Sequence, residues 1–345
     1  MITQKNDTIK YMVNIVSSGI AGCGEKEYYK DFAEFCAKKG RKVNVISVTD
    51  EVLEAAKETT AEITRYNILN FPKSTRNAWH QDALDNILRE RLKKDAINII
   101  NIHLTYWWKE SPEEVVSANI LNSFFEKLKP LFFVQITDGL EFIKERIDKV
   151  AENMGRALDL EGVIRWRDFE SFVTELFSQI HKKEYYLLPK EQSPDTLFRL
   201  IFDNRLKIYF SFPITFAADH IKKRTEKFIK KLDEIAIVFD PYKVEKFEHF
   251  PQKLKSLGAE VIIKRDYRLI NQSDFVVAYF PIVASSSGMI TEINYANSNG
   301  KIVYLIWPDK KYSPWTVYPA RKVFFSPEAC LKELRAVARQ RKPRR

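Results

Sequence analysis

The chain has 345 residues, of which 45% are hydrophobic and 30% charged, with a formal net charge of +10. This composition excludes a mostly disordered or fibrous protein, and the length fits two domains at roughly 100–200 residues per domain. No apolar run approaches the roughly 18 residues that span a bilayer, and the first residues contain no apolar signal core. We therefore expect a cytoplasmic protein without a membrane partner.

The sulfur and imidazole side chains form no recognisable metal motif. Cys23, Cys36 and Cys330 are too few and too far apart for a disulfide framework or a paired-cysteine zinc site. The five histidines have neither HExxH nor HxH spacing. We expect free thiols and no protein-bound metal.

Strand-like and helix-like segments alternate along the first half, which predicts an α/β protein with parallel sheets covered by helices. Apolar runs predict strands over 11–16, 42–48, 96–104, 131–137 and 184–188. A helix is expected over 26–39 and ends at Gly40. Serine, proline and two acids over 111–114 are typical of a helix start.

The first predicted strand leads into a glycine-rich segment. Gly19 and Gly24 have the GxxxxG spacing of a loop whose backbone N–H groups approach a phosphate at a helix N-terminus. The segment resembles the loop of P-loop kinases of the adenylate-kinase kind, and the resemblance loosely covers residues 9–200. It implies a three-layer, P-loop kinase-like first domain.

This loop departs from the kinase pattern directly after its second glycine. Glu25 and Lys26 stand where those kinases have Lys followed by Ser or Thr. The glutamate sets an anion against the β- and γ-phosphates, and the missing hydroxyl removes a Mg²⁺ ligand. We therefore predict that this half does not hydrolyse ATP or transfer its phosphoryl group, unless Lys26 swings back to serve as the missing lysine. Scaffolding, dimerisation, or binding of a nucleotide or RNA remain open for it.

The second half repeats the alternation on a smaller scale. Strands are predicted over 206–212, 235–239, 260–263, 275–280 and 301–306, and helices over 217–232, 248–257, 289–298 and 327–339. With a boundary near Asn204, the chain divides into 1–204, 205–330 and a basic tail over 331–345. The tail holds seven bases and one acid, and thus six of the +10 net charges. It is either a solvated terminus or a contact for RNA or an acidic partner.

A Ser/Gly loop follows the fourth predicted strand of this half. Ser286, Ser287 and Gly288 lead into a helix with Glu292 expected in its first turn. Small residues and free amides at a helix N-terminus form an anion site. The same field is expected to keep the Glu292 carboxylate ionised, which makes it a candidate nucleophile.

The pattern resembles the nucleoside 2-deoxyribosyltransferase superfamily, and within it the nucleoside 5'-monophosphate N-glycosidases, over about residues 205–310. The resemblance rests on Tyr209-Phe210, Arg265-Asp266, Ser273-Asp274, Ser286 to Glu292, Ala296 and Lys301–Pro308. It implies a flavodoxin-like domain in which Glu292 attacks the anomeric carbon and Asp266, at a strand end, assists departure of the base. Tyr209 orients the nucleophile.

The expected substrate contacts follow from the same resemblance. Ser286 is implied to contact a 5'-phosphate, and Ser287, Gly288 and Asp274 are expected beside the substrate. Asp274 is equally well interpreted as a turn or cap residue before its strand.

The implied reaction is cleavage or transfer at the N-glycosidic bond of a nucleoside or nucleoside 5'-monophosphate, without a cofactor. Breaking this bond builds oxocarbenium character, so a carboxylate on one face and an acid near the base suit a retaining mechanism. Water as acceptor gives hydrolysis and another base gives transfer; the sequence does not choose. The alternative is a non-catalytic protein that senses nucleotides or associates with RNA. A homodimer is also open, because related sites are often completed across a dimer.

Overall fold

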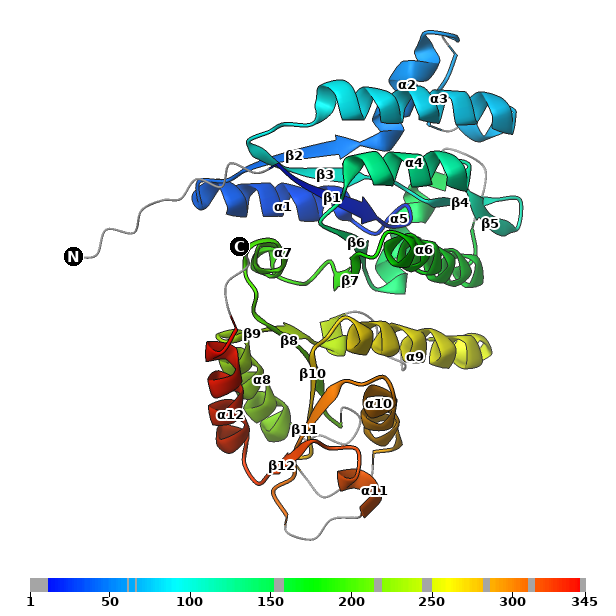
Figure 1. The fold of residues 1–345 in the computed structure, drawn as a ribbon. Coiled ribbons are helices and arrows are strands. Elements are labelled where there is room, and N and C mark those ends of the chain that lie inside the picture. The colour runs from blue at the N-terminus through cyan, green and yellow to red at the C-terminus, as the bar shows by residue number, and fades with distance from the viewer. Residues whose placement is uncertain are drawn as a thin grey trace, which may run out of the picture. The chain divides into compact units, whose positions relative to one another are not determined.

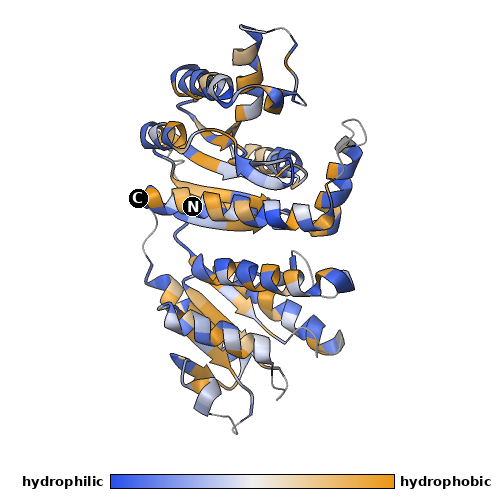
Figure 2. Cartoon of the chain, turned by 90° about the vertical axis from the view of Figure 1, so that its right-hand side faces the viewer, coloured by the Kyte–Doolittle hydropathy of each residue, from blue (hydrophilic) through white to orange (hydrophobic). Residues whose placement is uncertain are grey.

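The computed structural model describes residues 12–60, 62–65, 67–151, 158–213, 219–243, 250–281, 286–309 and 314–341. Contacts divide the chain into two compact units, Met1–Lys190 and Glu191–Arg345. Each unit is a three-layer α/β domain with its own five-stranded parallel sheet (Figure 1), as the alternation of elements predicts. Hydrophobic residues follow the strands of each sheet (Figure 2), which is typical of parallel strands covered on both faces.

The sheet of the first unit has the order β2-β3-β1-β6-β7. Its strands are β1 (Val13–Ser18), β2 (Lys42–Ser47), β3 (Ala96–Asn101), β6 (Phe132–Thr137) and β7 (Glu184–Pro189). Its helices are α1 (Glu25–Lys38), α2 (Val48–Lys57), α3 (Lys73–Asn86), α4 (Ala118–Leu128), α5 (Leu140–Ala151) and α6 (Leu160–Ile180), with helical turns at Ile68–Asn70 and Ile87–Arg91. Every strand expected in this half is present.

The helix start expected over 111–114 is wrong. These residues form β5 (Ser111–Glu114), which pairs antiparallel with β4 (Thr105–Trp108). Buried Glu170 accepts hydrogen bonds from the backbone N–H of Leu104 at 3.0 Å and of Thr105 at 2.8 Å, which fixes the start of this hairpin. An edge strand tolerates Pro112, so the β-prone aromatic residues of β4 decide the local structure.

The second sheet has the order β12-β11-β10-β8-β9. Its strands are β8 (Leu206–Ser211), β9 (Ala236–Phe239), β10 (Phe275–Tyr279), β11 (Ile302–Ile306) and β12 (Lys322–Phe324). The helices are α7 (Pro194–Phe202), α8 (Asp219–Asp233), α9 (Lys255–Asn271), α10 (Ser287–Ser298), α11 (Pro314–Val317) and α12 (Pro327–Arg339), with helical turns at Pro241–Lys243 and Gln252–Leu254. Counted along this unit, the order is 2-1-3-4-5, that of flavodoxin-like sheets.

The strand expected over 260–263 is wrong, because these residues lie within α9. Gly258, Val261, Arg265 and Leu269 are buried at helical spacing, so the period of burial outweighs the local β-branched run. The remaining strand of the sheet is the short β12. Part of the helix expected over 248–257 lies outside the described residues, and its last residues belong to α9.

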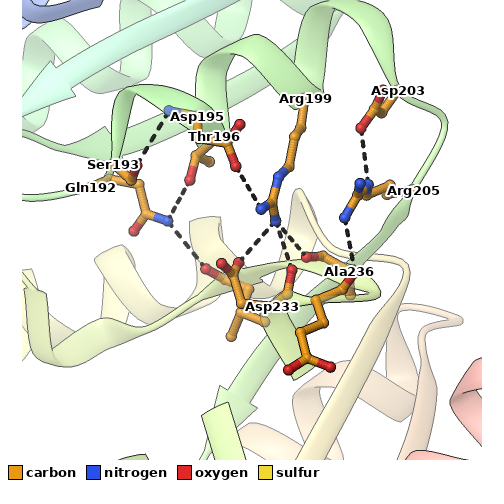
Figure 3. Close-up of polar contacts among 11 residues, drawn as sticks. Gln192, Ser193, Asp195, Thr196, Arg199, Asp203, Arg205, Asp233 and Ala236 are labelled. Carbon is orange, nitrogen blue, oxygen red and sulfur yellow. Dashed lines mark hydrogen bonds and ion pairs between the residues drawn. The ribbon is translucent and has the colours of Figure 1, made fainter. Parts of the chain in front are cut away.

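Helix α7 belongs with the second unit, so the division falls before the boundary expected near Asn204. Figure 3 shows the contacts responsible. Arg199 of α7 donates to the carbonyl of Asp233 at 2.7 Å and pairs with Asp195 at 2.5 Å. Gln192 donates to the carbonyl of Val238 in β9 at 3.4 Å. The bonds to Asp233 and Val238 hold α7 and the residues just before it to the second unit, while the pair with Asp195 lies within α7.

Much of the basic tail expected over 331–345 is helical. Residues through Arg339 belong to α12, and Leu331 and Leu334 are buried in the core of the second unit. Residues 342–345 lie outside the described part of the chain. Within that part, no helix is both long and apolar enough to cross a membrane.

Candidate active site in the second unit

Strand β8 brings two polar side chains to the carboxyl edge of the second sheet. Tyr209 and Ser211 are buried near the end of the strand, and Ser211 is paired in register with Ala278 of β10. The strand order changes direction between β8 and β10, and open α/β sheets bind ligands outside the carboxyl ends of strands at such a point. This edge is the expected place for a site.

Glu292 reaches this edge from α10. The Ser211 hydroxyl donates a hydrogen bond to its Oε2 atom at 2.5 Å. Helix α10 begins at Ser287, so Glu292 lies in the second turn and not in the first turn as expected. The helix N-terminus therefore acts on this carboxyl less than the sequence analysis assumed, since its field falls off within the first turn.

Asp266 belongs to the same group, although it lies on a helix and not at a strand end as expected. It is buried on α9, where Arg265 donates to its Oδ1 atom from Nε at 2.9 Å and from Nη2 at 2.7 Å. Helix α9 packs against both β8 and α10. The charges of Asp266 and Arg265 consequently act on Tyr209 and Glu292.

The expectation that Glu292 is held ionised is wrong. Burial, and next the charge of Asp266, raise the pKa of Glu292 to about 8, while Ser211, Tyr209 and Arg265 act in the opposite direction. Because the two carboxyl groups interact, they titrate as a pair. The pair therefore keeps a proton to a higher pH than an isolated glutamate does.

Tyr209 is fully buried, and its hydroxyl has no hydrogen-bond partner among the described residues. It lies near enough to the Glu292 carboxyl to lower the pKa of that group. Burial, followed by the charges of Asp266 and Glu292, raises the pKa of Tyr209 itself. The acceptor that interacts with this hydroxyl is the Glu292 carboxyl, so Tyr209 and Glu292 belong to one polar group at the sheet edge.

The predicted phosphate contacts lie at the start of α10. Ser286 caps the helix and its hydroxyl accepts from the Met289 N–H at 3.5 Å. Ser287 and Gly288 are exposed. The loop residues 282–285 just before them lie outside the described residues, as do 214–218 after β8.

Asp274 is not brought to this group. It directly precedes β10, and its Oδ2 atom accepts from the Lys207 N–H at 2.9 Å and pairs with Arg341 at 3.0 Å. These contacts lie at the amino ends of β8 and β10, the opposite edge of the sheet from Ser211. The structure thus places Asp274 as a residue that ties strand starts together.

The sequence analysis missed Ser211 and Arg265 as members of the site. A polar residue that ends a buried apolar strand is the signal that identifies Ser211. Arg265 is adjacent to Asp266, but its buried pairing is visible only once the segment is known to be helical.

In the first unit, Gly19 and Gly24 frame the loop between β1 and α1, with Gly24 in the left-handed conformation at φ 81°. Lys26 is exposed on α1, whereas Glu25 is buried. Within the described residues, no group of three or more His, Cys, Asp or Glu side chains is placed to hold a metal ion.

No family model matches the chain. The tryptophan–tRNA ligase of Gloeobacter violaceus is 27% identical over 124 residues, 35% of this chain and 35% of that protein, so the chain spans about a third of this curated relative.

Three solved structures show partial likeness. A conserved protein from Enterococcus faecalis V583 has 17% identity and a TM-score of 0.33, covering 39% of this chain and 99% of its own. Shikimate kinase from Acinetobacter baumannii in complex with shikimate has 12% identity and a TM-score of 0.37, with 56% and 94% covered. A sugar kinase from Janibacter sp. HTCC2649 has 14% identity and a TM-score of 0.32, with 55% and 92% covered. The fold assignment rests on the strand orders described above.

Proposed function

We propose that the second unit cleaves or transfers the N-glycosidic bond of a nucleoside or nucleoside 5'-monophosphate, with Glu292 as nucleophile. The observation that carries this proposal is the convergence of two carboxyl groups at the sheet edge: Glu292 bonded to Ser211, and Asp266 buried on the helix that packs against β8 and α10. Retaining enzymes that cleave glycosidic bonds use paired carboxyl groups, one as nucleophile and one as acid.

The raised pKa of Glu292 is compatible with one carboxyl group acting as nucleophile and the other as general acid. The attacking carboxylate must be ionised, and the departing base needs a proton. Transfer of the Glu292 proton to Asp266 leaves Glu292 ionised, and Asp266 then gives this proton to the departing base. Ser211 stabilises the ionised Glu292 through its hydrogen bond. A bond forms between Glu292 and C1' as the bond from C1' to the base nitrogen breaks. Water or a second base then attacks C1' and loses its proton to the Asp266 carboxylate, and the bond between C1' and Glu292 breaks, which restores both carboxyl groups.

The test measures release of free base by chromatography from a panel of nucleosides, deoxynucleosides and their 5'-monophosphates. Wild type and Glu260→Gln, a change to an exposed acid on α9, are expected to release base at equal rates. Glu292→Gln is expected to lose at least ~10³-fold of the rate, because removing a nucleophile leaves only binding and polar stabilisation. Absence of release from the whole panel, or release unaffected by Glu292→Gln, contradicts the proposal.

A second candidate function, association with RNA, is favoured by the surface of α8 and α12. A hollow of about 630 Å³ lies between these helices and is lined by Lys231, Glu234, Glu328, Leu331, Lys332, Arg335, Ala336 and Arg339. The basic residues that line the hollow outnumber its acidic residues. One of the basic residues, Arg335, pairs with Glu234 at 3.6 Å. Exposed bases without paired acids bind phosphate backbones with little sequence preference.

RNA binding at this hollow is tested against salt concentration. Reversal of Lys332 and Arg339 to glutamate is expected to weaken binding of a single-stranded RNA and to lower the salt slope by about one to two, since each phosphate contact contributes roughly 0.7. The matched control reverses Lys26 and Lys30, exposed bases of α1. Equal affinity of both double variants and wild type removes this candidate.

A further inference from the structure

The glycine loop of the first unit is filled by a side chain of the protein itself. Glu25, the first residue of α1, is only 6% exposed. Its Oε1 atom lies 2.5 Å from the position that a Cβ atom at Gly19 would take. The carboxylate therefore folds back over the first glycine of the loop, and any side chain in place of Gly19 would collide with it.

Basic groups surround the loop on several sides. Arg146 of α5 donates to the carbonyl of Gly22 at 2.6 Å, and a ring nitrogen of His103 contacts the carbonyl of Gly19. The Lys190 ammonium, which follows β7, lies 3.1 Å from the position of a Cβ atom at Gly24. Arg146 is itself paired with buried Asp138 at 2.6 Å. The Lys190 ammonium therefore supplies the positive charge beside the loop, in place of the residue after the second glycine.

The carboxylate is incompletely satisfied in this place. Its Oε1 atom is buried and has no hydrogen-bond partner within the described residues. Burial raises the pKa of Glu25, and the charges of His103 and Arg146 oppose that rise. A backbone N–H at Glu25 also lowers the pKa of this carboxyl, so the group is partly satisfied while its Oε1 atom stays without a donor. A buried acceptor without a donor costs free energy.

We propose that the loop from Gly19 to Gly24 is an oxyanion site that the Glu25 carboxylate occupies, and that a phosphoryl group enters only when this carboxylate is displaced or removed. The ligand class is inorganic phosphate, pyrophosphate or the phosphate end of a nucleotide. The sequence predicts that Glu25 repels a phosphate by its charge. Its position over Gly19 also blocks the phosphate sterically. The inference concerns the first unit and is independent of the function proposed for the second.

The experiment measures binding of pyrophosphate and of ATP, each without metal, to the full chain by calorimetry. Glu25→Ala is expected to bind pyrophosphate at least tenfold more tightly than wild type. Glu27→Ala, which removes an exposed acid from the same helical turn, is the matched control and is expected to match wild type. Adding Lys190→Ala to Glu25→Ala is expected to abolish the gain. If Glu25→Ala binds both pyrophosphate and ATP more tightly than wild type, the site is assigned to nucleotides. If it binds only pyrophosphate more tightly, the site is assigned to free phosphates.

Two further variants keep the test decisive. Glu25→Gln retains the shape of the side chain and is expected to stay closed to pyrophosphate. Glu25→Ser, too short to reach Gly19, replaces Glu25→Ala if the latter does not fold by circular dichroism. If a folded Glu25→Ala or Glu25→Ser variant binds pyrophosphate no more tightly than wild type does, the proposal is overturned.

Discussion

The two units place a buried or partly buried glutamate at comparable positions and surround it differently. Glu25 and Glu292 each lie on the helix that follows a central parallel strand, and burial raises the pKa of both. Glu25 packs over a glycine with one oxygen unpartnered, whereas Glu292 accepts from Ser211 and has a second carboxyl group nearby. The comparison teaches that an acid on the helix after a central strand has the environment that its donors and neighbours set, packed over a glycine in one unit and bonded to a strand hydroxyl in the other.

The largest expected effect concerns Asp266, the buried acid that acts on Glu292. Asp266→Asn is expected to lower base release by ~10²–10⁴-fold, the usual contribution of general acid catalysis. Asp203→Asn, at a partly exposed acid paired with Arg205, serves as control and is expected to leave the rate unchanged. Base release is followed by chromatography at a saturating substrate concentration. An unchanged rate for Asp266→Asn would assign this residue to a structural ion pair with Arg265.

The pH dependence of stability separates the Glu292 environment from an ordinary surface acid. The pKa of Glu292 in the folded state, about 8, is above its value in the unfolded chain, so the folded state binds more protons between about pH 4.5 and 8. The contribution of Glu292 to the free energy of unfolding is therefore present at low pH and is lost as pH rises through that window. The loss is at most ~1.4 kcal/mol per pH unit. Urea unfolding at pH 5 to 8 measures the slope, and Glu292→Gln is expected to flatten it. An identical slope in wild type and variant contradicts the assignment.

A smaller effect is expected at the unpartnered hydroxyl. Tyr209→Phe removes a buried donor that lacks a protein partner, so the free energy of unfolding is expected to change by less than ~1 kcal/mol. Base release is expected to fall about tenfold, since a hydrogen bond is worth ~1–1.5 kcal/mol. Chemical unfolding and steady-state rates are compared on one preparation. A large loss of stability with an unchanged rate would make Tyr209 a packing residue.

The smallest effect on activity is expected at Asp274. Asp274→Ala removes the bonds to the Lys207 N–H and to Arg341, and is expected to cost about 1 kcal/mol of stability. The rate of base release is expected to remain within twofold of wild type, because this residue lies at the other edge of the sheet. A loss of activity with unchanged stability would return Asp274 to the substrate site.

Sequence reasoning predicted the α/β class, because near-continuous apolar strands and helical periodicity survive without tertiary information. It failed where local signals competed, as at Pro112, where a cap pattern belongs to a hairpin, and at Val261, where a β-branched run lies in a helix. The grouping of Glu292 with Asp266 followed from a resemblance, while the raised pKa of Glu292 did not follow from the sequence. The pKa depends on burial and on a neighbour from another helix, and neither quantity is local in the chain.

The attachment of α7 to β9 has a consequence for how the halves can be separated. Arg199 and Gln192 bond to backbone carbonyls of the second unit, so a fragment that starts at residue 205 would leave those acceptors without their donors. Cutting between Lys190 and Glu191 keeps each sheet with all the helices that cover it. A separation of the halves therefore belongs at that peptide bond, with α7 kept on the C-terminal piece.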